Sequence, residues 1–240
     1  KMGPHFQEYL RELASVCDEY DDKQMVFEFY PDDKLGDIYH QYSQILTAHP
    51  KASAFFMEYR DNEWHAKNIE KKIENYLQSA NSTTPFFCIG NHDQPRIASR
   101  LGEERARALS FLNLLTPGIS VVYYGDEIGM TNGELTADDI QDNFSPANSV
   151  VDSRDLERTP MQWSNSQFAG FSIAKPWLPI NENHTKINVD SETIANDSLL
   201  NMHRRLLKLR QTLPILKNGD LSIVENTGNG FILGLKRELV

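Results

Sequence analysis

The 240-residue sequence has only two cysteines, Cys17 and Cys88, and fewer basic than acidic residues. Neither cysteine sits in a cluster with metal-ligand spacing, which argues against a zinc site. Cys88 lies in an apolar run, which favours a buried thiol. With 24 Lys and Arg against 34 Asp and Glu, the formal net charge is −10. A surface this acidic repels phosphate backbones and anionic lipid, so nucleic acid is excluded as the expected partner and a neutral or cationic substrate is favoured.

Long hydrophobic runs are missing as well. No apolar stretch reaches the roughly 18–20 residues that a membrane span requires. A basic-then-apolar signal is not present at the N-terminus, so membrane anchoring is not visible in this sequence. Four Asn-x-Ser/Thr sequons, at Asn81, Asn143, Asn183 and Asn196, favour a glycoprotein of the secretory pathway. We therefore expect an extracellular protein, either secreted or anchored at the cell surface.

The hydrophobic pattern alternates between strands and helices. Runs of strand-forming residues predict strands at 25–30, 52–57, 85–90 and 119–124. Apolar residues at helical spacing predict helices at about 4–16, after Trp64, at 103–115 and at 199–213. The stretch from 125 to about 197 has little periodicity, which predicts a long functional loop. From Leu221 onward the pattern is that of strands around a turn at 226–230.

Strands that alternate with helices predict an α/β fold with a parallel sheet. A (β/α)₈ TIM barrel needs eight strands and about 250 residues, so four strands make half of one. We expect residues 1–216 to form the second half of such a barrel, with the long loop at about 125–197 inside it. Residues 217–240 are then the start of a C-terminal β-sheet domain.

Two carboxylates stand where strands of this sheet end. Glu28 lies toward the end of the first strand among aromatic residues, and Asp93 follows the third strand in Gly90-Asn91-His92-Asp93. Parallel α/β folds form their sites at this end of the strands. Because a carboxyl among apolar neighbours is costly to ionise, we expect a raised pKa at Glu28, as a general acid requires. A proton donor with a second carboxylate and an imidazole suits glycoside hydrolysis.

Each of these features also has a plainer interpretation. A lone Glu in a strand is more often an edge or outward-facing residue, and Asn-His-Asp is commonly a loop with local hydrogen bonds. Trp163 and Trp177 are either sugar-stacking platforms or local packing. Arg154 and Arg158 either contact substrate or hold the long loop by salt bridges. The residues taken singly leave these alternatives open.

Several motifs occur together and in a fixed order. They are Gly90-Asn91-His92-Asp93-Gln94-Pro95-Arg96, Tyr123-Tyr124-Gly125-Asp126-Glu127-Ile128-Gly129-Met130, Arg154-Asp155, Arg158-Thr159-Pro160-Met161-Gln162-Trp163, Ala169-Gly170-Phe171 and Trp177-Leu178-Pro179. This series resembles the α-amylase family of glycoside hydrolases, and most closely its maltase and oligo-α-glucosidase branch. The first motif is similar to that family's strand-seven motif and the second to its strand-eight segment. The matching motifs span nearly the whole chain. Within the branch, the sequence is similar to animal, especially insect, maltases.

The resemblance implies a retaining α-glucosidase that removes terminal α-linked glucose from maltose or sucrose-type oligosaccharides. It implies that Glu28 is the proton donor of strand five and Asp93 the acid that stabilises the transition state. The sugar-binding residues are then Asn91, His92, Arg96 and Arg154. No cofactor and no metal ligand is implied among these residues, and a calcium ion would depend on an upstream half.

The sequence departs from the family pattern in three respects. Phe29 stands where the family usually has a small residue, and the segment after Glu28 lacks the branch's usual Pro-Phe-Asn-Phe-like stretch. The motif with the strand-four nucleophilic Asp would precede Lys1. We therefore expect this sequence to be a fragment and the isolated chain to be inactive.

Two other functions within the same family stay open. The ancillary heavy chain of amino-acid transporters shares the barrel and the long-loop motifs, but it is a non-catalytic, membrane-anchored partner. A sucrose or maltose isomerase or glucosyltransferase uses the same carboxylates. The intact Asn91-His92-Asp93 favours an enzyme, whereas Phe29 and the altered segment after Glu28 lean toward the transporter partner.

Overall fold

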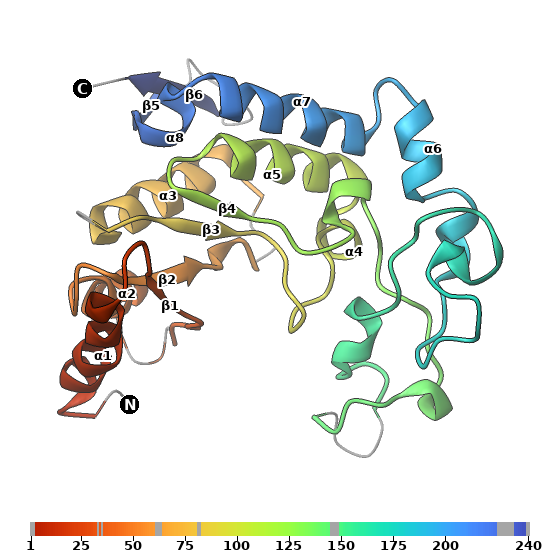
Figure 1. Ribbon diagram of the computed structural model, residues 1–240, viewed down its shortest axis with the longest axis horizontal. Coiled ribbons are helices and arrows are strands. Elements are labelled where there is room, and N and C mark those ends of the chain that lie inside the picture. The colour runs from red at the N-terminus through yellow and green to blue at the C-terminus, as the bar shows by residue number, and fades with distance from the viewer. Residues whose placement is uncertain are drawn as a thin grey trace. The chain divides into compact units, whose positions relative to one another are not determined.

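The computed structural model describes residues 3–32, 34, 36–60, 64–80, 83–144, 149–224 and 233–238. The chain divides into two compact units (Figure 1). The first unit comprises residues 1–88, 116–120 and 214–240, and the second comprises residues 89–115 and 121–213. The two units differ in how their interiors are built.

The first unit is built on the expected parallel sheet. Its strands, in the order β1-β2-β3-β4, are β1 (Met25–Phe27), β2 (Ala52–Phe56), β3 (Phe86–Cys88) and β4 (Ile119–Val121), the last of which ends in the second unit. Val26 pairs with Ser53 and Phe56 with Phe87 in parallel register. All four strands lie inside the predicted ranges, so the predicted α/β class is confirmed.

Three helices accompany this sheet, namely α1 (Phe6–Ser15), α2 (Ile38–Leu46) and α3 (Ala66–Ala80). Helices α1 and α3 were expected from their apolar spacing, but α2 was not. Asp37 caps α2 by accepting the Tyr39 amide at 2.9 Å, and Tyr42 and Ile45 are buried on its inner face. The prediction missed α2 because polar residues interrupt a short apolar stripe.

Aromatic rings fill the interior of the first unit. Phe56 of β2 stacks on Tyr76 of α3 with ring centroids 4.6 Å apart, and Tyr42 of α2 meets Tyr76 edge-on at 5.5 Å. Phe87 of β3 packs against Phe56 at 5.5 Å. The Tyr76 hydroxyl donates to the Ala54 carbonyl oxygen at 2.7 Å, so its polar end is satisfied inside the core.

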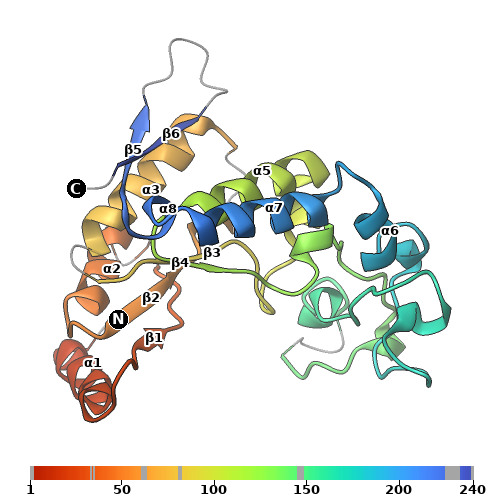
Figure 2. The same cartoon turned by 45° about the horizontal axis from the view of Figure 1, so that its top comes forward.

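The second unit joins helices to a long, irregular connection. Its helices are α4 (Ile97–Leu101), α5 (Glu103–Leu115), α6 (Val189–Ile194) and α7 (Leu199–Thr212). Helices α5 and α7 lie side by side (Figures 1 and 2). Leu114 of α5 packs with Leu199, Met202 and Leu206 of α7 in one apolar cluster. The two predicted helices thus bury their apolar faces against each other.

The connection from 125 to 197 is more ordered than a structureless loop. It contains α6 and several short 3₁₀ helices, among them Arg154–Glu157 and Glu182–Thr185, so the expectation of a loop over this whole range is wrong. Side chains hold it together: Gln162 donates to Asn183 at 2.9 Å, and Asn181 donates to the Thr131 hydroxyl at 3.0 Å. Side-chain hydrogen bonds of this kind do not produce a periodic pattern of apolar residues in the sequence.

The C-terminal segment contains α8 (Ile215–Asn218) and the antiparallel pair β5 (Asp220–Val224) and β6 (Gly234–Glu238). The expected C-terminal β-sheet is therefore present. The turn predicted at 226–230 lies outside the described residues, and the domain boundary at 217 stays a prediction. Among the helices that the structure describes, none has the length and apolar character needed to cross a bilayer.

Candidate active site

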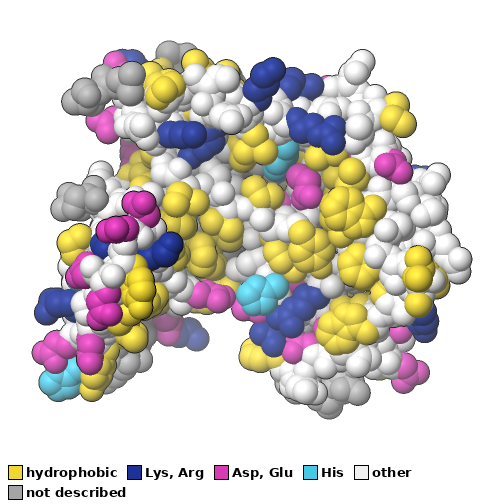
Figure 3. Space-filling model, viewed as in Figure 1, with side chains coloured by type: hydrophobic (Ala, Val, Ile, Leu, Met, Phe, Trp, Pro, Cys, Tyr) yellow, Lys and Arg dark blue, Asp and Glu magenta, His cyan; other side chains and the backbone are white. Residues whose placement is uncertain are grey.

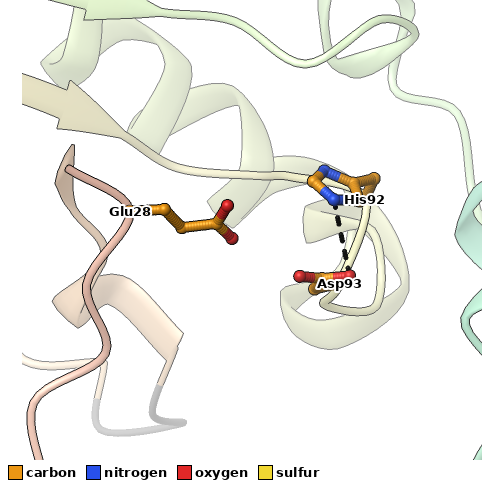
Figure 4. Close-up of side chains that lie close together, drawn as sticks. All are labelled: Glu28, His92 and Asp93. Atoms are coloured by element: carbon orange, nitrogen blue, oxygen red, sulfur yellow. Dashed lines mark ion pairs between the residues drawn. The ribbon is translucent and has the colours of Figure 1, made fainter. Parts of the chain in front are cut away.

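Asp93 lies in the loop between β3 and α4. Its backbone amide donates to the Asn91 side-chain oxygen at 2.9 Å, a local turn of the kind that Asn favours. His92 Nε2 lies 3.5 Å from Asp93 Oδ1, as the dashed line in Figure 4 shows. The Asp93 side chain is 22% exposed and that of His92 is 53% exposed. A carboxylate and an imidazole are therefore presented together at an accessible surface.

Two arginines of the long connection converge on Asp93. Arg154 Nη1 donates to Asp93 Oδ1 at 2.9 Å, and Arg158 Nη2 donates to the same oxygen at 3.0 Å. Arg158 Nε also donates to the His92 carbonyl oxygen at 2.9 Å. Charge-assisted hydrogen bonds are short and directional, so this pair fixes the orientation of the carboxylate. The sequence left open whether Arg158 contacts substrate or holds the long loop by salt bridges. The structure places it against Asp93 and His92.

A second carboxylate, Asp142, completes this cluster. Arg154 Nε donates to Asp142 Oδ2 at 2.7 Å and Arg154 Nη2 donates to Asp142 Oδ1 at 2.9 Å. These hydrogen bonds hold the pKa of Asp142 well below its ordinary value and raise the pKa of Arg154. Sequence patterns gave no indication of Asp142, because one acid among several in residues 138–142 carries no distinguishing signal.

Arg96 is placed differently from what the resemblance implied. Its side chain is 1% exposed, Nη1 donates to the Tyr124 carbonyl oxygen at 2.6 Å, and the guanidinium lies over the rings of Tyr123 and Tyr124 at 5.2 and 4.7 Å. The backbone amide of Arg96 donates to Asn132 at 2.7 Å. A guanidinium group this buried has no surface left to contact a sugar. Arg96 instead packs against Tyr123 and Tyr124 and stabilises the segment that contains them.

Two carboxyls near Arg96 are buried rather than exposed to substrate. Burial raises the pKa of Asp126 to about 7, and the positive charge of Arg96 opposes that shift. Burial likewise raises the pKa of Glu157 to about 7. A Cβ atom at Gly90 would approach Asp126 Oδ2 to 2.5 Å, so only glycine fits between this carboxyl and the Asp93 loop.

Glu28 belongs to the first unit and follows β1 directly (Figure 4). The expected dry environment is wrong, because β1 ends at Phe27 and the Glu28 side chain is exposed. Tyr30 Oη donates to Glu28 Oε1 at 3.3 Å. Phe29 packs edge-on against Tyr42 at 5.6 Å, which explains a large residue at that position. The convergence of Glu28 and Asp93 on one sugar ring stays a prediction.

A pocket of about 400 Å³ opens in the second unit beside Arg158. Its lining is mostly aromatic and apolar with two charged groups: Tyr124, Glu127, Arg158, Pro160, Met161, Trp163, Phe171 and Trp177. Figure 3 shows hydrophobic side chains gathered over this loop-rich region next to Lys or Arg side chains. Trp163 is 49% exposed and Trp177 is 69% exposed. Flat aromatic faces with a few polar groups are typical of small-molecule pockets.

Comparisons with known proteins identify the family of this chain. The family model for the alpha amylase catalytic domain matches residues 1–219. The chain is 33% identical to the alpha-glucosidase of Apis mellifera over 243 residues, which cover 98% of this chain and 42% of the bee protein. It is 38% identical to maltase 1 of Drosophila virilis over 161 residues, covering 64% of this chain and 25% of the fly protein.

Solved structures give the same picture of the fold. The trehalulose synthase MutB from Pseudomonas mesoacidophila MX-45 is similar with a TM-score of 0.80 and 27% identity, over 99% of this chain and 49% of that one. The alpha-glucosyl transfer enzyme XgtA is similar with a TM-score of 0.84 and 25% identity, over 99% of this chain and 44% of that one. The chain spans less than half the length of these relatives.

Proposed function

Because the chain belongs to the α-amylase family, we propose that it carries the proton donor and the transition-state-stabilising acid of a retaining α-glucosidase. The observation that carries this proposal is the Asp93 cluster, in which Arg154 and Arg158 hold one carboxylate oxygen beside His92. The similarity to an insect alpha-glucosidase and a maltase supports hydrolysis of a terminal α-linked glucose.

In the proposed reaction Glu28 protonates the leaving glycosidic oxygen and later accepts a proton from the attacking water. The strand-four Asp of the family, which the resemblance places upstream of Lys1, forms the glucosyl intermediate. The Glu28 side chain is exposed in this chain. In this proposal, residues outside the described ranges bury Glu28 and give it the dry surroundings that a general acid requires.

Asp93 stabilises positive charge that develops at the anomeric carbon. In the part of the chain that the structure describes, the side-chain contacts of Asp93 with His92, Arg154 and Arg158 all use Oδ1. Oδ2 is then the atom that accepts a hydrogen bond from a sugar hydroxyl, with His92 binding a second hydroxyl. Such preorganised groups stabilise the transition state more than the ground state.

The aromatic pocket beside Arg158 is the place we propose for the rest of an oligosaccharide. Trp163 and Trp177 expose flat faces that can stack on the apolar face of a sugar ring. Glu127 and Arg158 supply the polar contacts that orient hydroxyl groups.

We further propose a secreted or cell-surface glycoprotein, with Asn196 as a better acceptor than Asn183. Asn196 is exposed, whereas the Asn183 amide donates to Thr131 at 2.8 Å. Peptide mass spectrometry of the natural protein with and without endoglycosidase tests this, and an unmodified Asn196 would refute it.

The test of the enzymatic proposal uses the full-length protein with maltose as substrate. Glu28→Gln should lower kcat/KM by about 10²–10⁴-fold, the range of a lost general acid. Asp93→Asn should lower it by about 10²–10³-fold, the range of lost transition-state electrostatics. Glu103→Gln, an exposed carboxylate on α5, is the matched control and should keep full activity. Wild-type rates in either site variant, with folding unchanged, would refute the assigned role.

Glucosyl transfer is the second candidate, because a trehalulose synthase and a glucosyl transfer enzyme are among the similar structures. Product analysis separates the two. Free glucose from maltose and sucrose indicates a hydrolase, whereas a new disaccharide from sucrose indicates an isomerase or transferase. A non-catalytic transporter partner would give neither product.

A further inference from the structure

We infer that Asp142 is a positioning residue for Asp93 and that it acts through Arg154. The inference rests on the proposed function, in which Asp93 contacts the sugar. Asp142 itself lies one arginine away from that carboxylate, and its side chain is 7% exposed. It therefore acts on the reaction through the geometry and charge of Arg154.

Arg154 is shared between the two carboxylates. Nε and Nη2 make two bonds to the two oxygens of Asp142, at 2.7 and 2.9 Å. A two-point fork of this kind fixes the plane of a guanidinium group, which a single hydrogen bond does not. The remaining nitrogen, Nη1, is then directed at Asp93 Oδ1 at 2.9 Å.

The backbone at Asp142 is held in place by hydrogen bonds to another buried side chain. Asp155 is 0% exposed, and its Oδ2 accepts the amides of Gln141 at 2.6 Å and Asp142 at 2.8 Å. Asp142 Oδ1 accepts the Phe144 amide at 3.2 Å, and the Phe144 ring lies 4.5 Å from the Arg154 guanidinium. Asp142 thus has one defined position from which to orient Arg154.

Asp142 also balances the charge of the cluster. Arg154 and Arg158 bring two positive charges, and Asp93 and Asp142 bring two negative charges; Arg158 Nη1 lies 4.0 Å from Asp142 Oδ2. Removing the charge of Asp142 leaves a net positive group beside a reaction centre that itself becomes positive. It also frees Arg154 to take both oxygens of Asp93, including the one proposed for the sugar hydroxyl. Both effects raise the barrier of the chemical step.

The experiment measures kcat and KM for maltose with the full-length protein. Asp142→Asn, which keeps size and removes charge, should lower kcat by about 10–100-fold with a much smaller change in KM. Asp142→Glu should recover part of the loss. Asp138→Asn, an exposed acid on the same connection, is the control and should leave both constants unchanged.

A double-mutant cycle separates positioning from a merely structural role. If Asp142 acts through Arg154, the variant with both Asp142→Asn and Arg154→Gln should be no slower than Arg154→Gln alone. Multiplied losses, or a wild-type kcat in Asp142→Asn, would overturn the inference.

A crystal structure of Asp142→Asn gives a readout independent of activity. Arg154 turned onto both oxygens of Asp93 supports the inference, and an unmoved Arg154 overturns it. A wild-type protein inactive on every α-glucoside would instead sink the proposed function, and this structural readout would still decide the role of Asp142.

Discussion

The interiors of the two units differ in the charged side chains that they bury. The first unit buries aromatic rings such as Tyr42, Phe56 and Tyr76, each 0% exposed. Within the described part of the first unit, no Asp, Glu, Lys, Arg or His is buried. Among the residues of the second unit that the structure describes, six of this kind are buried, namely Arg96, Asp126, Asp155, Glu157, His203 and Arg210. The first unit is held by apolar packing, whereas the second combines apolar clusters, such as that of Leu114 and Leu199, with buried charged side chains.

The difference follows from where backbone hydrogen bonds go. Strand ladders satisfy the backbone in the sheet of the first unit, so its side chains are free to be apolar. The described residues of the irregular connection, 125–144 and 149–197, form no strand ladder, and buried amides there still need partners. Asp155 and Asn188 supply them, for example where Asn188 accepts the Ser191 amide at 2.8 Å. The Asp93 cluster is connected to this polar network, because Asp155 holds the backbone of Asp142 and Asp142 binds Arg154.

The largest expected effect tests the apolar unit. Phe56→Ala should lower the free energy of unfolding by about 3–5 kcal/mol, because it removes a ring that contacts Tyr76 and Phe87 and leaves a cavity. Urea unfolding at constant pH measures it. Phe111→Ala, at a position 45% exposed, is the control and should cost far less. Equal losses in the two variants would break the contrast between core and surface on which the comparison depends.

A smaller effect tests the polar unit. Asp155→Ala should lower the free energy of unfolding by about 2 kcal/mol, because it strips acceptors from the amides of Gln141 and Asp142. Asp155→Asn keeps one side-chain oxygen and should cost less. Asp152→Ala, an exposed acid nearby, should change stability by about 0.5 kcal/mol or less. Thermal unfolding compares the three, and an Asp155→Ala variant as stable as Asp152→Ala would show that the polar network contributes nothing to stability.

The smallest effect, when taken over a single pH unit, is a pH dependence that belongs to the second unit. Burial raises the pKa of Asp126 from 3.8 to about 7, so between these values the folded state binds a proton that the unfolded state has lost. The free energy of unfolding should therefore fall as pH rises through this window, by at most about 1.4 kcal/mol per pH unit for each such carboxyl. Glu157, whose pKa burial raises to about 7, adds to the slope.

Asp126→Asn is the variant that isolates this contribution. It cannot ionise, so its unfolding free energy, measured from pH 5 to pH 8, should fall less steeply than that of the wild type. If the two proteins showed the same change of unfolding free energy with pH, Asp126 would not be the group that titrates. The link between pH sensitivity and the buried carboxyls of the second unit would then be weakened.

Sequence patterns predicted those parts of the fold that repeat. Strands β1 to β4 and helices α3, α5 and α7 have apolar residues at regular spacing, because one face of each is buried. The short helices α4 and α6 present too few turns for such a pattern. The burial of Glu28 was predicted wrongly, since the strand ends one residue before it and the apolar neighbour Phe29 turns to Tyr42 instead.

The sequence by itself determined the α/β class, the family, and the position of Asp93 after a strand. Tertiary structure alone decided which groups meet there, because Arg154 and Arg158 reach Asp93 from 61 and 65 residues along the chain. It alone also showed Arg96 to be buried and Asp142 to hold Arg154. Local spacing sets which face a side chain occupies within its own element, whereas contacts over such separations depend on how the connection packs.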